Sequence, residues 1–217
     1  MTTEPANPAP RLDNQDPSLF GQTPSQTVGP FFHYGLPWKG CADLIGDSDI
    51  GARPELFPVE HYVLASPSAK GEVEGEPIVI EGVVLDADGK VVPDAMIEIW
   101  QADAAGRYVD GSCDIGFIGW GRASTGEDGV YRFLTIRPGR VDARQAPHIA
   151  VSVFGRGVIK RLATRLYFED EAANAADPIL ALVPAERRET LIACKAGAVW
   201  RFDIVLQGDR ETVFFDI

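Results

Sequence analysis

Residues 78–101, IVIEGVVLDADGKVVPDAMIEIWQ, decide the fold class of this chain. Two runs rich in Val, Ile and other β-formers flank the short stretch DADGK, and such side chains favour the pleated, half-buried surface of a strand. Asp88 and Gly89 suit a tight turn, because these residue types reach positive φ angles at low cost. The stretch therefore predicts a β-hairpin or near-hairpin and indicates a β-rich protein.

Strand-like runs recur along the rest of the chain, separated by turns that contain Gly and Pro. They lie at 130–136, 149–154, 162–168, 200–206 and 212–215. Seven short strands with such turns are typical of a β-sandwich. The segment 184–193, PAERRETLIA, predicts one short helix, since Pro184 suits a first helical position. We expect a mostly β protein with a single sandwich domain over 27–217 and one short C-terminal helix.

The N-terminal part has a different character. Residues 1–26 are rich in Pro, Asn, Ser and Gln and poor in apolar side chains, which predicts an extended arm rather than a domain. The next segment, TVGPFFHY at 27–34, is apolar and aromatic, so we expect it to pack against a partner. From there to residue 75 no clear periodicity emerges, and one short strand is predicted at 61–64.

Composition excludes several classes of function. The chain has 217 residues, 45% hydrophobic, with a net charge of −12. An acidic surface opposes binding to nucleic acids and anionic membranes, which reward clustered Lys and Arg. No membrane-spanning apolar run or secretion signal is present in the sequence. The cysteines, Cys41, Cys113 and Cys194, are odd in number and widely spaced, so we expect free thiols and a cytoplasmic protein.

No local motif in the sequence identifies a metal site or a catalytic reaction. The three histidines, His33, His61 and His148, lie far apart, so no HxH, HxxxH or HExxH motif supplies a local metal site. Phosphate-binding glycine loops, nucleophile elbows, CxxC pairs and EF-hand loops are also missing from the sequence. Many carboxylates are present, yet no spacing singles out two of them as an acid and base pair.

Longer stretches carry a resemblance to a family. They are GVVLDADGKVVPDAMIEIWQADAAGRY, GWGRASTGEDGVYRFLTIRPG, APHIAVSVFG and RLATRLYFED, all between residues 80 and 170. Together they resemble the intradiol ring-cleaving dioxygenases. Outside this core, TPSQTVGPF, RRETLIA and GDRETVFFDI resemble more narrowly the alpha-type chain of the family members that are built from alpha and beta chains.

The resemblance implies a sandwich shared by both chain types and an Fe(3+) ion in the beta chain, held by two tyrosinates, two histidines and solvent. Hard Fe(III) prefers anionic oxygen ligands, which explains that donor set. Carried over residue by residue, one tyrosine falls on Tyr108 and one histidine on His148, whereas Val141 and Ala150 stand at the other two positions. Because valine and alanine carry no donor, we expect this chain to bind no metal and the beta chain to hold the iron.

The resemblance also implies that residues of this chain form one wall of the substrate pocket. These are Thr27, Gly29 and Pro30 from the segment 27–34 that follows the arm, and Arg156 from a turn, and Tyr108 is expected to hydrogen-bond at the interface. Gly and Pro give a backbone that an aromatic ring can approach closely. A guanidinium suits the carboxylate of the implied substrate, 3,4-dihydroxybenzoate, which reacts with O2.

Other interpretations stay open at this point. One alternative is a stand-alone transthyretin-like β-sandwich module that kept the fold and lost catalysis, since folds outlive functions. A weaker alternative is an acid–base enzyme that uses two of the carboxylates. Individually, His148 is interpreted as a buried structural histidine, and Trp100 and Trp120 as packing residues. Without the family, Arg156 would be a solvated loop arginine.

Overall fold

The computed structural model of the chain describes residues 26–29, 31, 32, 41–46, 48, 50, 72–109 and 117–216. Within these ranges the chain is mostly β. The strands are β1 (Pro77–Leu85), β2 (Met96–Gln101), β3 (Trp120–Ser124), β4 (Val130–Ile136), β5 (His148–Phe154), β6 (Leu162–Phe168), β7 (Ile192–Ala196), β8 (Val199–Arg201) and β9 (Ile204–Val205). Three short helical segments, η3 (Ala172–Ala176), α1 (Pro178–Leu182) and η4 (Ala185–Leu191), lie between β6 and β7.

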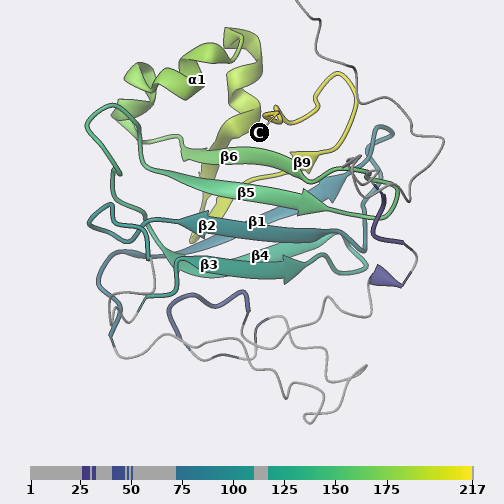
Figure 1. Cartoon of the computed structure of the whole chain (residues 1–217), viewed down its shortest axis with the longest axis horizontal. Coiled ribbons are helices and arrows are strands. Elements are labelled where there is room, and N and C mark those ends of the chain that lie inside the picture. Colours follow the sequence, from purple (N-terminus) through teal and green to yellow (C-terminus); the bar gives the residue numbers. More distant parts are fainter. Residues whose placement is uncertain are drawn as a thin grey trace, which may run out of the picture.

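The strands form one hydrogen-bonded path in the order β3-β2-β5-β6-β7-β8-β1-β4, with β9 paired to β1. This path folds over on itself, so that β1 crosses behind β2 and β5 (Figure 1). Alternate residues of both layers, such as Ile80, Phe133, Ile99 and Val151, point inward and form one buried apolar cluster. The predicted β-sandwich is thereby confirmed.

The predicted hairpin at 78–101 is wrong. The turn itself forms: the Asp86 carboxylate accepts hydrogen bonds from the backbone N–H groups of Asp88 and Lys90, and Gly89 has φ of 74°. After a single bridge between Leu85 and Val91, however, the chain crosses to the other layer of the sandwich, where it forms β2. β1 pairs with β4, β8 and β9, whereas β2 pairs with β3 and β5. Local turn chemistry did not decide the pairing, because both strands bury their apolar faces from opposite sides of the core.

Other elements differ in smaller ways. The predicted strand at 200–206 is broken into β8 and β9, and 212–215 makes only one isolated bridge, between Phe215 and Ala163. In place of the predicted helix at 184–193, the structure has the 3-10 segment η4. Pro184 occupies its N-cap position without a side-chain hydrogen bond, and β7 follows directly. The strand β3 was not predicted. The strand predicted at 61–64 and residues 1–25 of the predicted arm lie outside the described residues, and the domain boundary at residue 26 stays a prediction.

A buried carboxylate attaches the helical segments to the sandwich. Asp177, which is fully buried, accepts hydrogen bonds from the backbone N–H groups of Ile179 and Leu180 at the start of α1. It also accepts from the backbone N–H of Ala146, before β5, and from the hydroxyl of Tyr167 in β6. One side chain thus caps the helix and ties it to two strands of the sheet.

Two further expectations concern thiols and membranes. Cys41 is buried and Cys194 is exposed, and both are thiols rather than disulfides, as predicted, whereas Cys113 lies outside the described residues. In the part of the chain that the structure describes, no helix combines the length and apolar character that a bilayer crossing requires.

Candidate functional site

Thr27, directly after the predicted arm, contacts the turn between β5 and β6. The hydroxyl of Thr27 accepts a hydrogen bond of 2.8 Å from the backbone N–H of Gly157, a residue 130 positions away in the chain. Gly29 follows with φ of 83°, in the left-handed region that favours glycine. Pro30 lies outside the described residues. The structure therefore brings one predicted wall residue, Thr27, to the turn that carries Arg156.

Arg156 is not a freely solvated loop arginine. Its Nε atom forms an ion pair with the carboxylate of Asp94, in the segment that leads into β2. The Arg156 side chain is 51% exposed, whereas that of Asp94 is only 12% exposed. A half-exposed cation is thus held by a largely buried anion. Sequence reasoning missed Asp94, which no motif distinguishes from the other carboxylates.

Tyr108 lies at the other end of β2. Its ring packs against that of Trp100, with centroids 4.6 Å apart and planes inclined by 39°. Burial raises the pKa of the Tyr108 phenol above its usual value, an effect that the charge of Arg165 opposes. The phenol therefore stays protonated at neutral pH, unlike a tyrosinate bound to a metal. A hydrogen bond from Tyr108 to a partner stays a prediction.

His148 and Ala150 lie on the same face of β5, as the alternation of a strand requires, while Ile149 and Val151 face the core. The His148 ring is buried, and its Nδ1 lies 2.9 Å from the carbonyl oxygen of Ala146. Because a carbonyl only accepts, Nδ1 carries the proton. Burial lowers the pKa of His148, so the ring is neutral at neutral pH.

The residues at the four positions do not fit an iron site of two tyrosines and two histidines. Val141 and Ala150 carry no donor atom, and Val141 is partly exposed in the loop before β5. Tyr108 retains its proton, and one nitrogen of His148 donates to the backbone. Among the described residues, no group of three or more His, Cys, Asp or Glu side chains is arranged to hold a metal ion.

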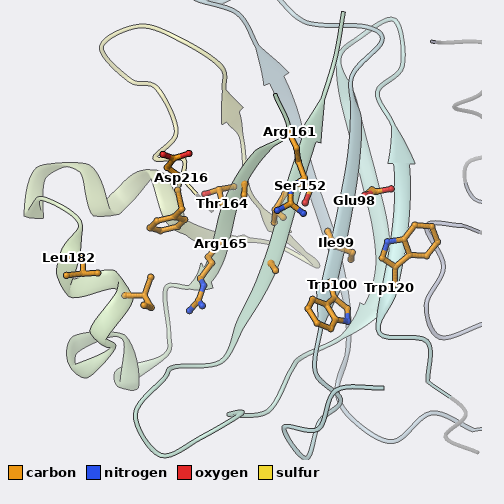
Figure 2. A pocket seen from close by; sticks show the side chains of 15 residues that line it. Glu98, Ile99, Trp100, Trp120, Ser152, Arg161, Thr164, Arg165, Leu182 and Asp216 are labelled. Carbon is orange, nitrogen blue, oxygen red and sulfur yellow. The ribbon is translucent and has the colours of Figure 1, made fainter. Parts of the chain in front are cut away.

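A pocket of about 680 Å³ lies over the same face of β2, β5 and β6. Figure 2 shows Trp100 and Trp120 on one side of it and Leu182, from α1, on the other, with Arg165 between them. Ala150 and Ser152 of β5 also line it. Trp100 is 50% exposed and Leu182 78% exposed, so Trp100 lies outside the buried core.

The site residues form two groups on one face of the sheet. The first group, Thr27, Gly29 and Arg156, lies beyond the C-terminal end of β5, and the second, with His148, lies at its N-terminal end. Six residue steps along β5 separate His148 from Phe154, which corresponds to roughly 20 Å in an extended strand. The predicted wall residues therefore lie far from the positions that correspond to metal ligands within this chain.

Comparison with known proteins agrees with the fold. Residues 58–208 match the family model described as Dioxygenase. The chain therefore belongs to this family, the intradiol ring-cleaving dioxygenases.

Within the family, the chain is similar to both chains of one enzyme. It is 46% identical to the protocatechuate 3,4-dioxygenase alpha chain of Burkholderia cepacia, over 90% of this chain and 98% of that one. It is 39% identical to the beta chain from the same organism, over 73% of this chain and 76% of the beta chain. Among solved structures, the dioxygenase domain of a carbohydrate-binding fusion protein from Streptomyces sp. SirexAA-E superposes with a TM-score of 0.54 at 26% identity, covering 86% of this chain and 98% of that domain.

Proposed function

We propose that this chain is the iron-free alpha subunit of a protocatechuate 3,4-dioxygenase. With a beta chain it forms the active site that cleaves 3,4-dihydroxybenzoate with O2 to 3-carboxy-cis,cis-muconate. The beta chain holds Fe(3+), which activates the dihydroxylated ring towards O2. The similarity to an alpha chain over nearly the full length of both proteins supports this assignment.

The observation that carries the proposal is the separation of the two groups of site residues. Arg156 and the Thr27 segment lie together at one end of β5, whereas Tyr108, His148 and Ala150 lie towards the other. A substrate pocket with Arg156 in its wall would therefore have no metal-ligand positions of this chain beside it. Another chain must complete that pocket, which is the arrangement expected of an alpha and beta pair.

In this proposal Arg156 binds the carboxylate of the substrate, and Thr27, Gly29 and Pro30 form the backbone wall. Tyr108 contributes at the subunit interface rather than at a metal. An exposed apolar side chain supports a partner: Val28, between the wall residues Thr27 and Gly29, is 41% exposed. A monomeric, stand-alone module would leave this side chain in water at a cost in solubility.

The test is to produce the chain alone and together with a beta chain, and to compare the purified proteins. Metal analysis should find iron only when the beta chain is present, and oxygen uptake with 3,4-dihydroxybenzoate should follow the same pattern. The beta chain alone is the control, because its activity should rise when this chain is added. Stoichiometric iron and ring cleavage in the isolated chain would contradict the proposal. A soluble monomer that ignores the beta chain would favour the stand-alone module.

A further inference from the structure

Asp94 and Arg156 meet because the sheet aligns the segments that carry them. β2 and β5 pair in antiparallel fashion, and Met96 lies opposite Phe154 at the end of their ladder. Continuing this pairing by two residues on each side brings Asp94 opposite Arg156. The ion pair therefore follows from the strand register rather than from an accidental loop contact.

The peptide that carries Asp94 is fixed on both flanks by Thr125, a buried residue directly after β3. The Thr125 hydroxyl accepts a 2.9 Å hydrogen bond from the backbone N–H of Ala95 and donates one of 2.7 Å to the carbonyl of Val92. The Thr125 backbone N–H also donates to the carbonyl of Ala95 at 2.9 Å. Asp94 is thus held between two anchored neighbours.

Asp94 approaches the guanidinium of Arg156 at Nε, which lies on one edge of the planar fork. A guanidinium also carries two Nη groups. Those groups can bind a second carboxylate in the bidentate geometry that suits arginine. An arginine on a turn otherwise samples many rotamers, and ordering a long side chain on binding weakens affinity.

We propose that Asp94 is a positioning residue, which holds Arg156 in the orientation that receives the carboxylate of a dihydroxybenzoate. This inference rests on the proposed function, in which Arg156 faces the substrate. Asp94 itself touches no substrate. The same turn also carries the Gly157 N–H that donates to the Thr27 hydroxyl. The orientation of Arg156 is therefore linked to the position of Thr27.

The first test is Asp94→Asn in the complex with the beta chain. The asparagine keeps the size of the side chain and removes its charge. The KM for 3,4-dihydroxybenzoate should rise roughly 2- to 10-fold, the effect of ordering one long side chain on binding. The kcat, and the KM for catechol, which lacks the carboxylate, should stay within twofold of the wild-type values. An unchanged or lower KM for 3,4-dihydroxybenzoate would overturn the proposal, because Asp94 would then merely neutralise Arg156.

The matched control is Asp88→Asn, an equal charge change in the same connection between β1 and β2. Asp88 pairs with Lys90 in an exposed turn and should not affect either KM. An equal rise in KM for both aspartate variants would show a general effect of net charge and would count against a specific role of Asp94.

A double-variant experiment separates this inference from the proposed function. Arg156→Ala should raise the KM for 3,4-dihydroxybenzoate roughly 10- to 100-fold, as expected for a lost charge-assisted hydrogen bond, and leave that for catechol unchanged. If it affects both substrates equally, the proposed role of Arg156 fails. If Arg156→Ala discriminates and Asp94→Asn adds its full effect in the double variant, Asp94 does not act through Arg156 and only the positioning inference fails.

Should the Asp94→Asn complex not assemble, Arg156→Lys supplies the same information. Lysine keeps the positive charge but has no Nε edge and no planar fork. We expect this variant to lose discrimination for the carboxylated substrate almost as fully as Arg156→Ala. A wild-type KM for 3,4-dihydroxybenzoate in the lysine variant would overturn the positioning role.

Discussion

The rings of Trp100 and Tyr108 are in contact, with centroids 4.6 Å apart, at the end of β2 that lies far from Arg156. Trp100 is also paired with Ala150 in the β2–β5 ladder. A tyrosine at a position that resembles a metal ligand of the family thus rests against an indole of its own chain. Its protonated phenol and its ring contact indicate a structural role in this chain.

Replacing this tyrosine separates its ring from its hydroxyl. Tyr108→Leu should lower the free energy of unfolding by about 0.5–1.5 kcal/mol more than Tyr108→Phe, because only leucine removes the aromatic contact. Urea unfolding of the full chain measures the difference. Neither change should alter the iron content of the complex with the beta chain. Loss of iron in the phenylalanine variant would show that Tyr108 ligates metal after all.

His148 should make stability depend on pH on the acid side. Burial keeps the pKa of the folded histidine below its usual value of about 6.5, and the charge of Arg165 acts in the same direction. Contact with the Ala146 carbonyl and the charges of Asp177 and Asp142 oppose this. The unfolded chain therefore binds more protons, and stability is complete above about pH 7 and is lost as the pH falls below about 6.5.

The variant His148→Gln tests this dependence, because glutamine can still donate a hydrogen bond and does not titrate. Urea unfolding between pH 5.5 and 7.5 should show a flatter slope for the variant than for the wild type. One titrating group contributes at most about 1.4 kcal/mol per pH unit. Parallel slopes in the two proteins would exclude His148 as the cause, since the other titrating groups are common to both.

Asp177 should be among the side chains most important for stability. Asp177→Ala removes a helix cap and leaves the N–H of Ala146 and the hydroxyl of Tyr167 without their acceptor, so we expect a loss of about 2–4 kcal/mol. The matched control is Glu171→Ala, since Glu171 caps η3 through the N–H of Ala173, has one long ion pair of 3.8 Å with Arg137, and is partly exposed. That change should cost about 0.5–1 kcal/mol. Equal losses for the two variants, measured by urea unfolding, would contradict the central position assigned to Asp177.

Gly29 should affect substrate binding through the backbone conformation of the segment that follows the arm. A Cβ atom at this position would meet no other atom within 4 Å, so Gly29→Ala acts only through its positive φ. The cost of the left-handed conformation is about 1–2 kcal/mol. We expect a higher KM for 3,4-dihydroxybenzoate in the complex. Gly197→Ala is the control, because Gly197 also has a positive φ and open space but lies in the turn between β7 and β8. An equal rise in KM in the Gly197 variant would contradict a specific effect of Gly29, because strain at a distant turn would then have the same result.

Much of the fold was predictable from strand composition. The bounds of β4 and β6 match the predicted ranges 130–136 and 162–168, because their side chains are strongly β-forming and turns flank them. By contrast, β3 was missed because Gly121 and small or charged residues dominate it. The glycine is needed there for space, since a Cβ on it would approach Leu44 Cδ1 to 2.5 Å. Such a requirement depends on a neighbour far along the chain.

The site was predictable only through the family resemblance. That resemblance named Thr27, Gly29 and Arg156, and the structure shows Thr27 hydrogen-bonded to Gly157, the residue after Arg156. The contact of Arg156 with Asp94 was beyond the sequence, because it depends on which strand pairs with β2. A hairpin between β1 and β2, as the turn chemistry suggested, would not have aligned Asp94 with the turn after β5. Pairing between strands that are distant in the sequence therefore explains two failures of prediction. One is the hairpin between β1 and β2, and the other is the missed contact of Asp94 with Arg156.

The hydrogen bond between Thr27 and Gly157 also bears on the order of folding. The N–H of Gly157 lies in the turn that connects the paired strands β5 and β6. Closing a loop of 130 residues is entropically costly, so we expect Thr27 to dock after the sandwich has formed rather than to guide its formation. A half-folded chain would then present no finished surface to a beta chain, and only folded chains would assemble.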